Sequence, residues 1–224
     1  MTKKQNNRIK NSIEVPFFSS VNKSTPLKDI ALLLDKLEKN SIDKVPWPRF
    51  SYKPEASFTI AHSDDCLMIK YYINEKYVKA DYHHTNDPVY RDSCVEFFIG
   101  FENEKNYYNF EFNCVCTCMS AFGAGKHERE LLPNSIIQNI KMQTLLQKEC
   151  DVARPIVSWE LTAAIPVGVF YYHKLTTLRG TCCQINFFKC GDDLPEPHFL
   201  SWSNIVSPEP DFHLPEFFGE MKFV

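Results

Sequence analysis

Two neighbouring stretches of the sequence carry acidic and amide side chains at alternate positions of otherwise apolar runs. Residues 93–101 contain Glu96, and residues 106–114 contain Asn109 and Glu111. Because successive side chains of a strand point to opposite faces, the second run predicts a polar face and an apolar core face. The predicted core face consists of Tyr108, Phe110 and Phe112. Carboxylates accept hydrogen bonds and amides both donate and accept them, which suits a polyhydroxylated ligand.

Three interpretations of this polar face remain open. Glu96 and Glu111 could be the paired carboxylates of a glycoside hydrolase, which need a separation of about 5–9.5 Å and one acid of raised pKa. The face could instead bind a sugar without catalysis, or it could be a solvent-exposed face with no ligand. Asn109 and the similarly patterned run with Gln184, Asn186 and Phe188 favour binding, since amides match hydroxyl groups without transferring protons.

The cysteines and acidic pairs define what metal chemistry the chain could support. Nine cysteines are present, but no pair of CxxC motifs and no zinc-type spacing of Cys and His occurs, which favours buried, reduced thiols over disulfides or a metal centre. Asp64–Asp65 and Asp192–Asp193 are acidic pairs in turn-like segments. Either could bind a structural calcium ion, although solvated turn residues are the simpler interpretation. No cofactor is required by any motif.

Composition excludes several classes of partner. The formal net charge of -3 gives no reason to expect nucleic acid, and no stretch is apolar for the ~18 residues of a membrane helix. The first 15 residues lack the apolar segment of a signal peptide. Together with reduced thiols, this pattern leads us to expect a cytoplasmic protein, and the polar face described above leads us to expect a saccharide as its partner.

The elements that must position the polar face are mostly short strands. Pro26 and an apolar stripe at Ile30, Leu33, Leu34 and Leu37 predict one N-terminal helix. From residue 56 onward, short β-rich runs with polar connections predict an all-β, antiparallel, jelly-roll-like sandwich. The expected strands are 56–62, 66–74, 77–82, 93–101, 106–114, 116–122, 135–146, 157–165, 179–189, 198–203 and 217–223. A Pro-rich coil precedes the last of them, residues 1–44 form a tail and helix packed on the domain, and residues 45–224 form a single domain.

Several motifs, in order along the chain, resemble the family 9 carbohydrate-binding modules. The first is Tyr90-x-Asp92-Ser93-x-Val95-Glu96, in which the Asp follows the aromatic by two positions. The resemblance extends from about Val45 to the C-terminus. The remaining motifs are Trp159-Glu160-Leu161-Thr162-Ala163-Ala164-Ile165-Pro166, Gln184-Ile185-Asn186-Phe187-Phe188-Lys189, Leu200-Ser201-Trp202 and Phe218-Gly219.

This resemblance implies a β-sandwich, calcium in some members, and a slot where aromatic rings clamp a terminal sugar. It implies that the chain binds a sugar in carbohydrate catabolism without being an enzyme. Tyr90 would be one clamp face, Glu96 a hydroxyl acceptor, and Asn186 the amide of a later strand. Asn109 or Glu111 stands where the family places a basic contact. Lys189 stands at the second clamp position, so the resemblance leaves Phe188 or Trp202 as the second aromatic. A protein-interaction module with a decayed sugar site is the remaining alternative.

Overall fold

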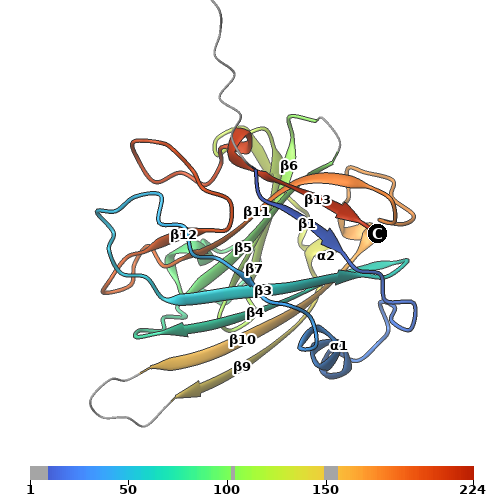
Figure 1. Cartoon of the computed structure of the whole chain (residues 1–224), viewed down its shortest axis with the longest axis horizontal. Helices are drawn as coiled ribbons and strands as arrows, with labels where there is room; N and C mark the ends of the chain where they lie inside the picture. The colour runs from blue at the N-terminus through green and yellow to red at the C-terminus, as the bar shows by residue number, and fades with distance from the viewer. Residues whose placement is uncertain (1–9, 102–103, 149–155) are drawn as a thin grey trace, which may run out of the picture.

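The computed structural model describes residues 10–101, 104–148 and 156–224. Its strands form two sheets packed face to face (Figure 1). The larger sheet has eight strands in the order β1-β13-β11-β5-β6-β7-β8, with β12 paired to β11. The smaller sheet has the order β2-β3-β4-β10-β9. The predicted β-sandwich is confirmed, with one parallel pair, β1 and β13, in an otherwise antiparallel arrangement.

The elements have the following bounds. The larger sheet comprises β1 Ser12–Val15, β5 Cys94–Phe101, β6 Tyr107–Asn113, β7 Cys118–Gly123, β8 Arg129–Leu131, β11 Cys182–Cys190, β12 Phe199–Ser201 and β13 Gly219–Phe223. The smaller sheet comprises β2 Asn40–Ser41, β3 Glu55–His62, β4 Cys66–Glu75, β9 Lys141–Lys148 and β10 Val157–Pro166. The helices are α1 Leu27–Leu34 and α2 Asn134–Ile137, with short 3-10 turns at Val89–Arg91, Val167–Val169 and Pro215–Phe217.

Three apolar clusters account for the layers. The main core lies between the sheets and contains the predicted core face of β6, namely Tyr108, Phe110 and Phe112. A second cluster covers the outer face of the smaller sheet, where Ile30 and Leu34 of α1 pack. The third lies on the outer face of the larger sheet, beneath loops from residues 47–50 and 199–218. Both faces of the larger sheet are therefore buried near its centre.

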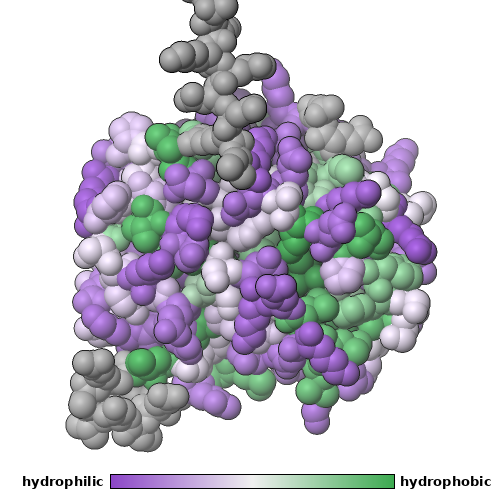
Figure 2. Space-filling model, in the orientation of Figure 1, coloured by the Kyte–Doolittle hydropathy of each residue, from purple (hydrophilic) through white to green (hydrophobic). Residues whose placement is uncertain are grey.

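The N-terminal segment, residues 10–44, contributes a strand to each of the two sheets. Strand β1 pairs in parallel with β13, and β2 pairs with β3, so residues before 45 contribute strands as well as the predicted helix. Pro26 stands at the N-cap of α1. None of the helices within the described ranges is long and apolar enough to cross a membrane. The surface seen in Figure 2 mixes hydrophilic and apolar side chains.

Two expected strands were wrong or incomplete. Residues 77–82 are not a strand, because their backbone N–H groups bond to side chains: Asp81 and Tyr82 donate to the Asp92 carboxylate at 3.0 and 3.1 Å. The expected strand 135–146 begins instead with α2 and becomes β9 only at Lys141. Pro133 is the N-cap of this helical turn, and its carbonyl accepts the backbone N–H groups of Ile136 and Ile137 at 2.8 and 3.2 Å.

Candidate functional site

The polar face predicted from β5 and β6 lies on the outer side of the larger sheet. Glu96 and Glu111 are direct cross-strand partners, so their Cβ atoms lie about 4.5–5.5 Å apart. Both carboxylates are almost completely buried, with 3% and 2% of their residue surface exposed. They form the floor of a cavity of about 130 Å³. Its remaining walls come from Tyr90, Lys126, Arg129, Cys190, Asp192, Phe199, Pro210, Asp211, Phe212 and His213.

Glu111 is held by one cation and one amide. Arg129 of β8 donates to Glu111 Oε1 at 3.3 Å, and Asn109 Nδ2 donates to the same oxygen at 2.8 Å. Glu111 Oε2 is buried and has no hydrogen-bond partner among the described residues. A buried polar atom left unpaired costs about 1–3 kcal/mol, so this oxygen is a strong candidate for contact with a ligand.

The pKa values of Glu96 and Glu111 are both raised, but by different surroundings. It raises the pKa of Glu96 well above its usual range, and the neighbouring Glu111 charge raises it further. Burial also raises the pKa of Glu111, but Arg129 opposes that shift by stabilising the ionised form. Glu96 therefore holds its proton more tightly than Glu111, and Glu111 is the member of the pair that ionises first as the pH rises.

His213 fixes the cation that balances Glu111. Arg129 Nη1 donates to His213 Nε2 at 3.0 Å, so the imidazole proton lies on Nδ1, which donates to the Tyr107 hydroxyl at 2.8 Å. Burial and the Arg129 charge lower the pKa of His213 to about 2. A neutral imidazole thus aligns the guanidinium on Glu111 without adding a second positive charge.

The aromatic walls rest on a stacked pair. The rings of Phe188 and Phe212 are parallel, with centroids 4.1 Å apart. Phe212 lines the cavity and Phe188 supports it from the sheet. Phe199 and Tyr90 provide further ring surface around the same cavity. Stacked rings of this kind present the apolar face on which the C–H side of a sugar packs.

The loop that closes the site is anchored by Asn186. Its Nδ2 donates to the Ser203 carbonyl at 3.0 Å, and its Oδ1 accepts from Ser203 N at 2.8 Å. Trp47 Nε1 donates to the Ser207 carbonyl at 3.0 Å. Asn186 therefore anchors the start of the segment that carries Phe212 and His213.

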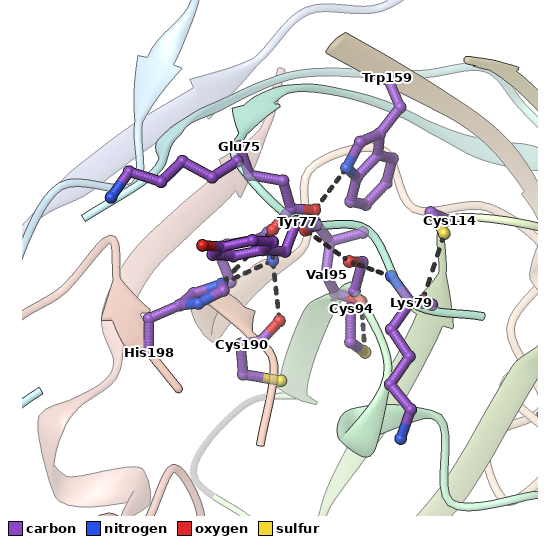
Figure 3. A network of polar contacts seen from close by, with 12 residues as sticks. Glu75, Tyr77, Lys79, Cys94, Val95, Cys114, Trp159, Cys190 and His198 are labelled. Atoms are coloured by element: carbon purple, nitrogen blue, oxygen red, sulfur yellow. Dashed lines mark hydrogen bonds and ion pairs between the residues drawn. The ribbon is translucent and has the colours of Figure 1, made fainter. Parts of the chain in front are cut away.

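Two residues of the predicted site lie elsewhere. Lys189 points into the space between the sheets, where its Nζ lies 3.0 Å from Glu75 Oε2, with both side chains fully buried. Figure 3 shows Glu75 receiving the Trp159 indole N–H, with His198 beside it. Trp202 packs edge-on against Phe58 and Phe187 in the main core. The structure does not bring Lys189 or Trp202 to the cavity.

The remaining predicted residues are accounted for. Tyr90, Glu96 and Glu111 line the cavity directly, and Asn109, Asn186 and Phe188 support its lining. The sequence interpretation missed Arg129, Phe212 and His213, because they come from an edge strand and a loop where no periodicity marks the inward face. The basic contact absent from β6 is supplied across the sheet by Arg129.

The acidic pairs Asp64–Asp65 and Asp192–Asp193 each have contacts with other parts of the protein. Asp65 Oδ1 accepts from the Lys23 backbone N–H at 2.9 Å and from the Ser63 hydroxyl at 3.2 Å. Asp193 lies 3.7 Å from Lys79 Nζ. One oxygen of Asp65 thus accepts hydrogen bonds from the protein and Asp193 lies near a lysine, and calcium binding at either acidic pair stays a prediction. The cysteines of the described ranges are free, and six of these eight are buried, whereas Cys116 is half-buried and Cys182 is exposed; Cys150 lies outside those ranges.

Comparison with known proteins identifies the family. A sequence model described as carbohydrate-binding family 9 matches residues 27–223. A candidate carbohydrate-binding protein from Bacteroides uniformis ATCC 8492 is 34% identical over 96% of this chain and 100% of its own, with a TM-score of 0.87. Two solved structures of family 9 binding modules from Caldicellulosiruptor kristjanssonii, each with a bound sugar, share the fold at 14% identity. The complex with glucose covers 96% of both chains at a TM-score of 0.61. The match to the complex with cellotriose covers 95% of this chain and 93% of the other chain, with a TM-score of 0.60. No curated protein matches the sequence. The chain belongs to carbohydrate-binding family 9, a family of non-catalytic binding modules.

Proposed function

We propose that the cavity above Glu96 and Glu111 binds one terminal sugar ring. The observation that carries this proposal is the buried, unpartnered Oε2 atom of Glu111 at the cavity floor. A sugar hydroxyl group would donate a hydrogen bond to this oxygen and recover the free energy lost by burying it. Tyr90 and Phe212 would supply the aromatic faces on which the ring packs.

The protonation of the carboxylates assigns each a different role. Ionised Glu111, fixed by Arg129, would accept hydrogen bonds from sugar hydroxyls. Protonated Glu96 would donate one hydrogen bond to a hydroxyl oxygen. One site thus offers an acceptor and a donor side by side, which matches the two-way hydrogen bonding of a vicinal diol. Family membership supports this non-catalytic use of the pair over glycoside hydrolysis.

The size of the cavity supports a single ring. Pockets that enclose drug-sized ligands measure roughly 300–1,000 Å³, whereas this cavity measures about 130 Å³. A chain of several sugars would therefore extend into solvent beyond the first ring. The related modules in complex with glucose and cellotriose make these two sugars the first probes to use.

Calorimetric titration with glucose and cellotriose tests the proposal. The wild-type protein should show saturable binding, and Glu111→Gln should weaken it about tenfold or more, because an amide N–H₂ would face Arg129 and one charged acceptor would be lost. Glu96→Gln should have a milder effect, since an amide resembles the protonated acid. Glu220→Gln is the matched control, because Glu220 is an exposed glutamate on β13 of the same sheet.

Two results would reject the proposal. One is the absence of binding by wild-type protein at millimolar concentrations of glucose, cellotriose and other common monosaccharides. The other is equal affinity of the wild-type and Glu111→Gln proteins for a sugar that does bind.

As to location, the free thiols within the described ranges support the expected cytoplasmic setting, because such thiols persist in reducing compartments. Cell fractionation would test that location.

A further inference from the structure

A cluster of two thiols and one carboxyl group lies at the edge of the cavity floor. Cys94 is the first residue of β5 and Cys190 the last of β11, and the two are direct cross-strand partners. Cys190 Sγ donates to Glu96 Oε1 at 3.1 Å. One ligand atom from each of Cys94, Glu96 and Cys190 lies within 4.8 Å of the other two, and all three residues are buried. Both cysteines are labelled in Figure 3.

The spacing of these atoms is close to that of a tetrahedral metal site. Zinc binds thiolate sulfur at about 2.3 Å and carboxylate oxygen at about 2.0–2.2 Å, which places tetrahedral ligand atoms roughly 3.6–3.8 Å apart. The widest separation in the cluster exceeds that range by about 1 Å at most. Rotation of side chains at the strand ends can supply such a contraction, because Cys and Glu both turn about χ1.

The ligand set selects the class of cation. Two sulfur ligands favour thiophilic ions such as Zn²⁺ or Cd²⁺, whereas Ca²⁺ and Mg²⁺ take oxygen ligands in larger numbers. Three protein ligands leave one tetrahedral position open. Glu96 and Cys190 both line the cavity, so that position can be filled from the cavity by water or by a ligand hydroxyl.

We propose that Cys94, Glu96 and Cys190 form a binding site for a thiophilic divalent cation at the floor of the cavity. Binding involves no oxidation: each thiol loses its proton to solvent and forms one metal–sulfur bond, and the Glu96 carboxyl group likewise loses its proton. Burial raises the pKa of Cys94 to about 12 and that of Cys190 further, so proton release accompanies binding at neutral pH. Arg129 is paired with Glu111, and Lys126, which lines the same cavity, supplies further positive charge near the loaded site.

Cobalt(II) titration of the reduced, full-length protein tests the site. We expect one Co²⁺ per chain, with sulfur-to-cobalt charge-transfer absorption and the visible bands of tetrahedral cobalt, both of which Zn²⁺ abolishes. Cys94→Ser and Cys190→Ser should each lose the charge-transfer absorption. Cys114→Ser is the matched control: Cys114 is also a buried thiol, but it faces the main core, and this variant should keep the full signal.

A second measurement avoids dependence on the variants. X-ray absorption of the Zn²⁺-loaded wild-type protein should show two sulfur ligands with oxygen completing the shell. Absence of cobalt absorption in the wild-type protein, its persistence in Cys94→Ser, or a zinc shell without sulfur would overturn the proposal. Sugar titration of chelator-treated wild-type protein reports on the sugar site separately. Sugar binding with no cobalt signal would reject the cation site alone, and cobalt binding with no sugar binding would reject the sugar site alone.

Discussion

Replacing Lys189 by Met should destabilise the protein severely without altering sugar recognition. The Lys189 ammonium is fully buried 3.0 Å from Glu75 Oε2, and the Glu75 carboxylate also accepts the Trp159 indole N–H at 2.7 Å. Removing the cation leaves a buried carboxylate without its charge partner, which typically costs 3–5 kcal/mol. For a domain whose total stability is of the order of 5–15 kcal/mol, that loss is a third or more of the whole.

A double-variant cycle isolates the ion pair. Adding Glu75→Gln removes the stranded charge while keeping an acceptor for Trp159, so Lys189→Met/Glu75→Gln should return to within about 1–2 kcal/mol of the wild-type protein. The free energy of unfolding is measured by urea denaturation with a fluorescence readout. If Lys189→Met costs less than about 1 kcal/mol, or if the double variant is no more stable than the single one, the pair does not act as argued. A large loss of sugar affinity in folded Lys189→Met protein would instead restore Lys189 to the binding site.

Two further predictions concern the cavity, and a third concerns His198 beside the buried Lys189. Arg129→Gln should weaken sugar binding about tenfold in calorimetry, because Glu111 would lose the cation that keeps it ionised; unchanged affinity would show that Glu111 needs no such partner. Phe212→Leu should lower sugar affinity about fivefold by removing the ring stacked on Phe188, with only a small shift of the urea midpoint, and a large midpoint shift with full affinity would contradict that. Burial and the Lys189 charge lower the pKa of His198 to about 2, so below pH ~6.5 the unfolded chain binds a proton that the folded one does not. This group's contribution to stability should fall as the pH falls, by about 2 kcal/mol at pH 5, and His198→Asn should lack that part of the decline in urea titrations at pH 7 and 5.

The sequence was informative wherever side chains alternate along a strand. In β6 every second residue is aromatic, so the period alone placed Tyr108, Phe110 and Phe112 in the core and Glu111 on the opposite face, as the structure confirms. The family resemblance was confirmed as well. Both inferences rest on patterns among residues that are close together in the sequence.

The inference was weaker where both faces of a strand are buried. Strand β11 is apolar on both sides, with Phe187 in the main core and Phe188 in the outer cluster, so hydrophobicity does not mark its ligand-facing side. Position parity does carry a signal: Asn186 and Phe188 share one face, and Lys189 must then lie on the other with Phe187. Counting from Asn186 would have directed Lys189 toward the space between the sheets.

The cavity walls depend on contacts between segments far apart in the chain. Arg129 reaches Glu111 from an edge strand, and His213 reaches Arg129 from a loop 84 positions further on. No local pattern relates these residues, because loop conformation is fixed by anchors such as the bonds between Asn186 and Ser203 rather than by its own periodicity.

The two faces of β11 divide stability from recognition within a single strand. Odd-numbered Phe187 and Lys189 secure the two sheets, whereas even-numbered Asn186 and Phe188 hold the loop and ring that close the cavity. Because neighbouring residues serve different layers, a change at Phe188 can alter the cavity while the Lys189 ion pair keeps the sheets in register. The walls of the cavity therefore come from loops and an edge strand, while the buried faces of the two sheets fix the position of its floor.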